Sequence, residues 1–212
     1  MLKVCETFFS IQGESSFAGY PCAFVRLAGC NLRCSYCDTR YAWEGGDDMP
    51  VAQVADLVCS HGSTLVEITG GEPLIQEDTP ALVKALLDRN RTVLVETNGT
   101  RDLSPIPDGA IRIVDIKSPG SGETGRMDWD NIGRLRSGDE VKFVLCDEPD
   151  YAWAKDTILR HGLDGAVKLH FSPAAGRLDP ARLAGWILRD ALNVRLQVQI
   201  HRILWPGSER GR

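Results

Sequence analysis

The strongest constraint on the fold of this chain is a regular alternation of two kinds of segment. Short runs rich in β-branched residues and bounded by Gly, Pro, Asn or Asp are typical of buried strands, and runs with one apolar helical face follow them. The strand-like runs are residues 22–28, 63–69, 92–97, 111–117, 140–146, 166–171 and 194–200, with 3–9 as a less certain eighth. The helical runs are residues 50–60, 78–89, 149–161 and 180–191, with 126–137 as a weaker candidate.

This alternation predicts parallel strands joined by right-handed helical crossovers. A closed eight-stranded barrel typically needs about 250 residues, and this chain has 212. We therefore predict an α/β fold, a single-domain partial TIM-like (βα) barrel over residues 22–206. Residues 1–21 form an N-terminal segment, and residues 207–212 are expected to be a flexible tail. Asp78 or Thr79 should cap the second helix, and Asp179-Pro180 should begin the last one.

The chain has seven cysteines, an odd number, so they cannot all pair with one another. A chain of this length folds without disulfides, and its first residues lack a charged segment followed by a long apolar run. We therefore expect a reducing, cytoplasmic setting. No stretch approaches the roughly 18 apolar residues of a membrane span. Lys and Arg are scattered in a chain of net charge −5, so we expect neither nucleic acid nor membrane as a partner.

Polar residues gather directly after the strand-like runs. Because the carboxyl ends of parallel strands meet at one rim, where sites of such folds lie, these segments should come together. The segments are Cys30–Tyr41, Thr69–Pro73, Thr97–Thr100, Lys117–Gly122 and Ser172–Pro173. Asp115 and Lys117 alternate along one strand and should face the same cavity.

Cys30, Cys34 and Cys37 have the spacing C-x3-C-x2-C, so three thiolates can bind one metal centre from a single loop. Structural zinc needs four ligands, and the loop offers no fourth Cys or His, although Asp38 or a distant residue could serve. A four-iron cluster held by three thiolates leaves one iron open to a substrate or cofactor, and the spacing favours it. The cysteines not spaced for metal, which we predict to be small core residues, are Cys5, Cys22, Cys59 and Cys146.

The segment CNLRCSYC, with Tyr36 before the third cysteine, resembles the signature of the radical S-adenosylmethionine (radical SAM) superfamily. The TGGEP segment, Thr69–Pro73, resembles the GGEP motif of that superfamily, whose glycine backbone can approach SAM closely. The resemblance implies a full or partial barrel and one [4Fe-4S] cluster on Cys30, Cys34 and Cys37. It also implies that the open iron chelates SAM, which is then cleaved to methionine and a 5′-deoxyadenosyl radical.

Longer matches extend over nearly the whole chain. FFSIQGES, FVRLAGCNLRCSYCDT, TGGEP, ETNGT and the closing QIH resemble the 7-carboxy-7-deazaguanine synthase family. That resemblance implies a Mg²⁺-dependent lyase of queuosine and related 7-deazapurine biosynthesis, which regenerates SAM. Its reaction converts 6-carboxy-5,6,7,8-tetrahydropterin to 7-carboxy-7-deazaguanine with loss of ammonia. The implied partners are a flavodoxin-type electron donor and a second copy of the chain in a homodimer.

The same resemblance implies roles for individual residues. The substrate-binding residues would be Gln12, Gly13, Glu14, Arg26, Thr69, His201 and Pro206. The SAM-binding residues would be Tyr36, Cys37, Asp38, Gly71, Glu96, Ser118, Pro119, Gly120, Ser172 and Pro173. The Thr39 hydroxyl would bind Mg²⁺ together with substrate oxygens and water.

Structural interpretations of some of these residues stay open. Gln12-Gly13 could be an ordinary turn, and a single strand histidine such as His201 is commonly structural. Arg26 lies inside an apolar strand and needs an anion, either the substrate carboxylate or a salt-bridge partner. Ser15 stands where relatives often carry Gly, and it is small enough to fit.

Two other functions also stay open. A radical SAM activase that installs a glycyl radical would share the cysteines, the GGEP-like turn and a strand ending in Asp115-Ile116-Lys117. The N-terminal IQGE segment together with Arg26 favours a pterin pocket over a groove that docks a partner protein. A non-catalytic zinc or iron–sulfur module is the second alternative, distinguished by its metal and sulfide content.

Overall fold

The computed structural model describes residues 1–208 and 210–211, and in this part of the chain it contains one sheet of nine strands. The strands are β1 (Leu2–Ile11), β2 (Pro21–Leu27), β3 (Asp47–Met49), β4 (Leu65–Gly70), β5 (Thr92–Thr97), β6 (Ile111–Lys117), β7 (Glu140–Leu145), β8 (Lys168–Pro173) and β9 (Arg195–Leu196). The helices are α1 (Val51–Ser60), α2 (Thr79–Leu87), α3 (Glu148–His161), α4 (Pro180–Arg189) and α5 (Ile200–Leu204).

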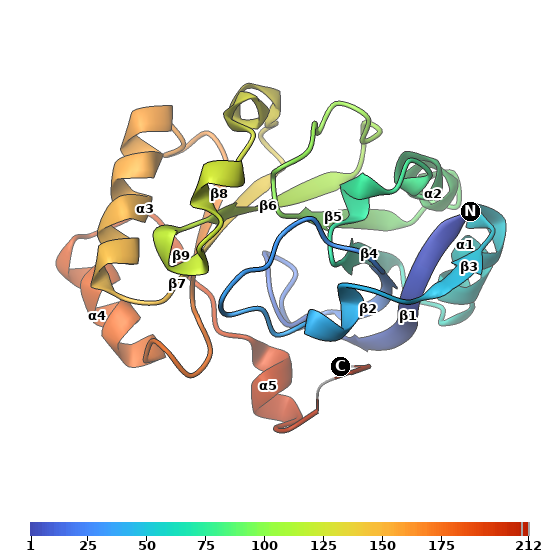
Figure 1. The fold of residues 1–212 in the computed structure, drawn as a ribbon, viewed down its shortest axis with the longest axis horizontal. Helices are drawn as coiled ribbons and strands as arrows, with labels where there is room; N and C mark the ends of the chain where they lie inside the picture. Colours follow the sequence, from blue (N-terminus) through green and yellow to red (C-terminus); the bar gives the residue numbers. More distant parts are fainter. Residues whose placement is uncertain (209, 212) are drawn as a thin grey trace.

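The strand order is β3-β1-β2-β4-β5-β6-β7-β8-β9, so the sheet runs almost in chain order and has two open edges. Every pair from β2 to β9 is parallel, whereas β1 pairs antiparallel with both β2 and β3. Figure 1 shows the curved sheet with α1 and α2 at one end and α3 and α4 at the other. The predicted partial barrel is thus confirmed, with β1 and β3 added to its first edge.

Strand alternation gives the sheet two different faces, because residues two apart share a face. Val66 and Ile68 of β4 face the helices and join the main hydrophobic core, which includes Val54 of α1 and Leu82 of α2. The concave face begins with a second apolar layer. The residues of this layer are Phe8, Cys22, Phe24, Leu65, Leu94 and Ile113.

Two positions further along the same strands, the concave face becomes polar. Glu67, Glu96 and Asp115 follow Leu65, Leu94 and Ile113 at this spacing on β4, β5 and β6. Burying carboxyl groups at this depth is costly unless they are paired or hold a ligand. The strand pattern therefore places a polar layer between an apolar floor and the rim formed by the strand ends.

The structure differs from the sequence prediction at the end of the chain. Residues 194–200 were expected to form a strand, but β9 comprises only Arg195–Leu196, and His201 lies in α5. The Gln197 amide still donates to the Phe171 carbonyl at 2.9 Å. The chain then leaves the sheet, because the Gln197 and Gln199 side chains bind groups on the N-terminal segment.

Two smaller expectations were also wrong, and a third was confirmed. The weak helix at 126–137 is instead two 3₁₀ turns, Thr124–Arg126 and Trp129–Arg134. Neither Asp78 nor Thr79 caps α2 through its side chain, since the Thr79 hydroxyl donates to the Pro73 carbonyl at 2.6 Å instead. The expected Asp179 cap is present and accepts from the Ala181 amide at 2.9 Å.

The cysteines outside the cysteine loop have different environments. Cys22 and Cys146 are buried as predicted, whereas Cys5 and Cys59 are only half-buried. Burial raises the pKa of the Cys5 thiol and of the Cys146 thiol. Among the helices of the described residues, none has the length and apolar character needed to cross a membrane.

Candidate active site

A cavity of about 870 Å³ lies at the carboxyl ends of the parallel strands. Its volume is in the range of small-molecule sites, which is roughly 300–1,000 Å³. Its wall comes from the N-terminal segment, the cysteine loop, the strand ends and the C-terminal segment. The predicted site residues that line it are Gln12, Gly13, Glu14, Arg26, Cys30, Cys34, Tyr36, Cys37, Asp38, Thr39, Thr69, Gly71, Glu96, Ser172, Pro173, His201 and Pro206.

The three cysteines of the loop reach this cavity together. Burial raises the pKa of the Cys34 thiol to about 11 and also raises that of Cys30. Within the described residues, no three His, Cys, Asp or Glu side chains are gathered for a single metal ion. A four-iron cluster gives each thiolate its own iron, so its ligands need not converge on one point. The all-thiol donor set and the shared cavity therefore fit a cluster, whose binding displaces the thiol protons.

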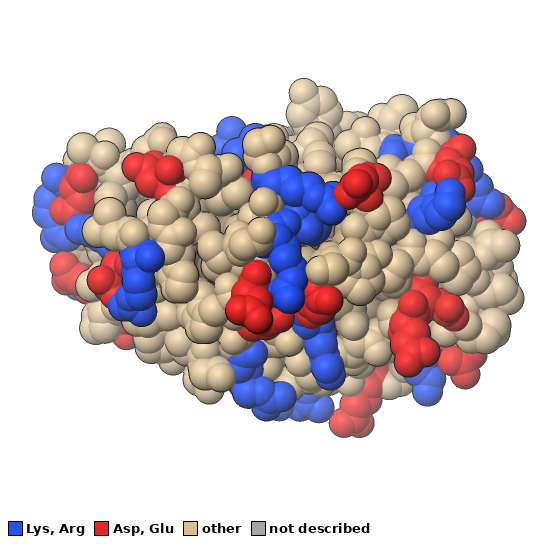
Figure 2. Space-filling view, turned by 90° about the horizontal axis from the view of Figure 1, so that it is seen from above, with Lys and Arg blue, Asp and Glu red and all other residues tan. Residues whose placement is uncertain are grey.

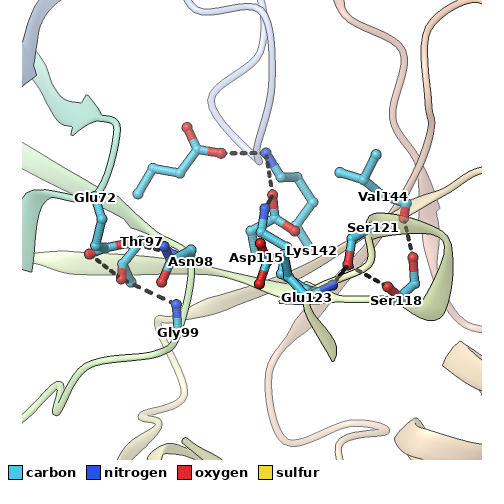
Figure 3. Close-up of polar contacts among 12 residues, drawn as sticks. Glu72, Thr97, Asn98, Gly99, Asp115, Ser118, Ser121, Glu123, Lys142 and Val144 are labelled. Carbon is cyan, nitrogen blue, oxygen red and sulfur yellow. Dashed lines mark hydrogen bonds and ion pairs between the residues drawn. The ribbon is translucent and has the colours of Figure 1, made fainter. Parts of the chain in front are cut away.

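Ser118, Pro119 and Gly120 are not among the described residues that line the cavity. They support the cysteine loop from behind, because the Gly120 carbonyl accepts from the Ser35 hydroxyl at 2.6 Å. The Ser118 hydroxyl donates to the Val144 carbonyl at 2.7 Å, as Figure 3 shows. A Cβ on Gly120 would lie 2.4 Å from a carboxyl oxygen of Asp150, so a side chain has no room there.

The TGGEP segment joins two strand ends and the cysteine loop. A Cβ on Gly71 would lie 2.0 Å from the Gly29 carbonyl oxygen, so only glycine permits this approach. Glu72 is fully buried and accepts hydrogen bonds from the Thr97 hydroxyl at 2.8 Å and from the Asn98 amide at 2.6 Å (Figure 3). Burial raises the pKa of Glu72. This carboxyl, which carried no role in the sequence analysis, ties the rim of β4 to that of β5.

Lys142 is the centre of the polar layer, and the sequence analysis did not identify it. Its ammonium bonds to Glu14 at 2.8 Å and to Glu96, and it lies 3.7 Å from Asp115. Figure 3 shows Lys142 beside Asp115. Burial alone would raise the pKa of Glu96, but the Lys142 charge overrides burial and lowers it. Lys117 and Asp115 face the cavity together as predicted and pair at 2.8 Å.

Arg26 forms the salt bridge that was one of its two predicted environments, and it also faces the cavity. Its Nε donates to Glu6 at 2.9 Å, which is a structural ion pair. The guanidinium also lines the cavity, between the rings of Phe8 and Tyr41 at 5.7 and 5.9 Å from their centroids. The aromatic rings and Glu6 fix the guanidinium at the wall, where a planar anion can reach it.

The N-terminal segment and the start of α5 close one side of the cavity. The Gly13 carbonyl accepts from the Ile200 amide at 3.1 Å, and a Cβ on Gly13 would lie 2.2 Å from Nδ1 of His201. Glu14 accepts from the Gln199 side chain at 2.8 Å. Ser15 has a φ of 64°, in the left-handed region that favours glycine. Burial lowers the pKa of His201.

Asp38 and Thr39 link the cysteine loop to α5. The Thr39 hydroxyl donates to Asp38 at 2.9 Å, and Arg202 donates to the same carboxylate at 3.0 Å. Beyond α5, Gly207 and Ser208 also line the cavity. The predicted flexible tail, 207–212, includes residues 209 and 212, which lie outside the described residues.

Figure 2 shows basic and acidic side chains interspersed over one face of the molecule.

The fold and the site can now be compared with known proteins. The sequence profile of the Radical SAM superfamily matches residues 25–115, from β2 through the cysteine loop to β6. The crystal structure of QueE from Escherichia coli is similar to this fold with a TM-score of 0.77 and 24% identity, and the match covers 93% of each chain. Fold and cysteine loop together define a radical SAM protein.

Curated relatives narrow the class. A 7-carboxy-7-deazaguanine synthase from Chlorobaculum tepidum is 45% identical over 99% of this chain and 97% of its own. Another from Koribacter versatilis is 40% identical over 99% of this chain and 100% of its own. The chain belongs to the 7-carboxy-7-deazaguanine synthase family of radical SAM enzymes. Membership of this family therefore supports neither of the two alternative functions, the glycyl-radical activase and the non-catalytic metal-binding module.

Proposed function

We propose that this chain converts 6-carboxy-5,6,7,8-tetrahydropterin to 7-carboxy-7-deazaguanine with release of ammonia, in queuosine and related 7-deazapurine biosynthesis. The observation that carries the proposal is the meeting of the three loop cysteines and Arg26 on one cavity wall. A cluster site and an anion site in one cavity suit an enzyme that brings a radical source to a small carboxylated substrate.

Cys30, Cys34 and Cys37 would hold the [4Fe-4S] cluster, and Tyr36, Gly71 and Ser172 would contact SAM. When bound, the cluster and SAM supply a 5′-deoxyadenosyl radical able to take a hydrogen atom from the substrate. The residues of the chain orient the reactants and exclude water. Glu72 contributes by fixing the backbone of the rim around Asn98, where SAM and substrate would meet.

Arg26 and Thr69 are register partners on the neighbouring strands β2 and β4, and they would orient the substrate from the same side of the cavity. The guanidinium would take the substrate carboxylate as a bidentate pair. Thr69 donates to Glu96 at 3.2 Å, so its hydroxyl oxygen keeps acceptor capacity for a substrate N–H group. Gly13 leaves room for His201 to approach the same substrate, and Pro206 would contact it from the C-terminal segment.

Thr39 would provide one oxygen ligand for Mg²⁺, which commonly keeps several waters and relies on substrate oxygens. Its hydroxyl bonds to the Asp38 carboxylate, so the pair presents anionic oxygen at the cavity wall beside the cysteine loop. Asp38 is itself held by Arg202. A single hydroxyl with a carboxylate beside it fits an ion that is completed by substrate.

Three further features belong to this proposal. A flavodoxin-type protein would supply the electron that reduces the cluster, the chain would act as a homodimer, and it would work in the cytoplasm. The family resemblance supports all three features, and the net charge of −5 fits an enzyme that acts on a free pterin rather than on RNA.

Product analysis tests the proposal. Anaerobically reconstituted protein is incubated with carboxytetrahydropterin, SAM, Mg²⁺ and a reductant, and carboxydeazaguanine and ammonia are measured. We expect both products from the wild type and neither from Cys34→Ala, which should stay soluble but lose SAM cleavage. Protein that has an intact cluster and cleaves SAM but forms no carboxydeazaguanine would contradict the proposed function.

A further inference from the structure

Glu67 lies on the cavity wall and has no role in the function described above. It stands inside β4, two positions before Thr69 and two after Leu65, on the concave face. Its side chain is only 5% exposed, and the apolar floor that includes Leu65 lies next to it along the strand. A carboxyl group buried this deeply normally has partners for both of its oxygens.

The partners of Glu67 account for only one oxygen. Oε2 accepts a hydrogen bond from Nε2 of Gln12. Across residues 1–208 and 210–211, no hydrogen bond reaches Oε1, and no Lys or Arg forms an ion pair with this carboxyl. An unpartnered oxygen on the wall of a ligand cavity points to a partner that the ligand brings.

Gln12 acts here as a positioning residue. It is 2% exposed, its Nε2 donates to Glu67, and its Oε1 accepts from the Glu14 amide at 3.1 Å. Both ends of the amide are therefore used to hold two acidic residues in place. Recognition of the substrate ring then falls to the Glu67 carboxyl, which Gln12 holds in place.

We propose that Glu67 is a substrate-recognition residue whose Oε1 accepts a hydrogen bond from an N–H group of the bound pterin. This inference rests on the proposed function. A tetrahydropterin carries ring N–H groups and an exocyclic amino group, so it offers several donors. An ionised carboxyl group is an acceptor only, and charge-assisted bonds of this kind are about twice as strong as neutral ones.

The charges around Glu67 couple this hydrogen bond to the protonation state of its carboxyl group. Burial raises the pKa of Glu67 well above its usual range, and the Glu96 charge on β5 and the Glu14 charge raise it further. The Gln12 bond and Lys142 on β7 act in the opposite direction, and the Cys22 thiol faces Glu67 from β2. Before substrate binds, these effects together favour the protonated acid. Ligand N–H donors favour the ionised form, so substrate binding should release a proton.

Calorimetric titration tests this inference without turnover. Cluster-loaded, SAM-bound protein is titrated with carboxytetrahydropterin at pH 6 in buffers of different ionisation enthalpy, which gives the number of protons released. We expect the wild type to release protons on binding, up to one for each substrate bound. In Glu67→Gln this release should be lost, and affinity should fall by about tenfold to a hundredfold. The exposed control Glu77→Gln should match the wild type, and SAM affinity should be equal in all three.

The outcomes separate this inference from the proposed function. Wild-type affinity or undiminished proton release in Glu67→Gln would overturn the role of Glu67 and leave the proposed function intact. If Glu67→Gln does not fold, the test is the number of protons that the wild type releases on substrate binding. A wild type that releases none would overturn the proposed role of Glu67. A wild type that does not bind carboxytetrahydropterin would defeat both.

Discussion

Arg26 joins a structural role to an expected functional one. Its Nε pairs with Glu6, and two aromatic rings confine its guanidinium at the cavity wall. Replacing it by alanine removes the expected partner of the substrate carboxylate. Hydrogen bonds to charged groups contribute roughly 1.5–3 kcal/mol, so substrate affinity should fall about tenfold to a hundredfold in Arg26→Ala.

Binding titrations of substrate and of SAM check this prediction. SAM affinity should be unchanged, because Arg26 is not among the residues expected to contact SAM. Arg26→Lys should fall between the wild type and Arg26→Ala, since it keeps the charge but loses the planar fork. Unchanged substrate affinity in Arg26→Ala would remove this residue from the site.

Asp139 belongs to a buried network far from the chemistry. It accepts from the Arg112 backbone amide at 3.0 Å and from Arg112 Nε at 2.8 Å, and both side chains are almost fully buried. Asp139→Asn leaves the buried guanidinium without its counter-charge. Breaking such a pair costs about 3–5 kcal/mol, and denaturant unfolding of the cluster-free protein would measure this loss.

The exposed pair of Asp156 and Arg160 on α3 provides the control. Asp156→Asn should change the unfolding free energy by less than about 1 kcal/mol, because solvent screens the pair. An equal, small effect of both substitutions would show that the Arg112 network does not stabilise the fold.

At the scale of elements, α5 is held by contacts that begin in the N-terminal segment. A Cβ on Gly13 would lie 2.2 Å from His201, so Gly13→Ala should push α5 away from the cavity. We expect faster hydrogen exchange over residues 199–205, weaker substrate binding and unchanged SAM binding. Gly133→Ala is the matched control, because open space surrounds Gly133. Wild-type exchange rates in Gly13→Ala would show that this contact does not hold α5.

Sequence patterns identified the inner strands accurately and the edges poorly. The predicted bounds of 92–97 and 111–117 coincide with β5 and β6, because a strand with neighbours on both sides keeps its full apolar run. β3 was missed, since DDM lacks strand propensity and forms only through pairing with Leu2–Val4. The end of the chain was misread because Gln197 binds the Ser15 amide, a contact 182 residues away that no local pattern records.

The sequence predicted the residues of the candidate site well where they belong to a motif and poorly where they do not. The loop cysteines, the first three residues of TGGEP and Arg26 line one cavity, as the order of the strands suggested. Lys142 and Glu67 were missed because a charged residue in a buried strand carries no local sign of the cavity it faces. The available signal was a charge in the middle of each apolar run, Lys142 in EVKFVL and Glu67 in LVEITG.

At the scale of the whole molecule, buried carboxyl groups link stability to pH. Glu140 is fully buried, and its carboxyl lies 2.8 Å from Nε2 of His170 and accepts from the Ser16 amide at 2.9 Å. Burial alone would raise the pKa of Glu140, but the nearby His170 and the Ser16 amide lower it. Its stabilising effect should therefore be complete above the ordinary glutamate pKa of about 4.3 and be lost as pH falls through the lower folded value.

Unfolding of the cluster-free protein between pH 7 and pH 3 checks the sign of this effect. The wild type should lose stability more steeply below about pH 4.3 than Glu140→Gln does, because the variant lacks the titrating carboxyl. Parallel curves for the two proteins would mean that Glu140 has the same pKa folded and unfolded.

The central claim is that one cavity brings the cluster, SAM and the pterin within reach of one another. Deuterium placed at C6 of carboxytetrahydropterin tests it most directly, with SAM and 5′-deoxyadenosine analysed by mass after anaerobic turnover. We predict that deuterium enters the adenosyl group in the wild type, at a rate that follows carboxydeazaguanine formation, and that Cys34→Ala transfers none. Cleavage of SAM without any deuterium transfer, in the presence of bound substrate, would contradict the account.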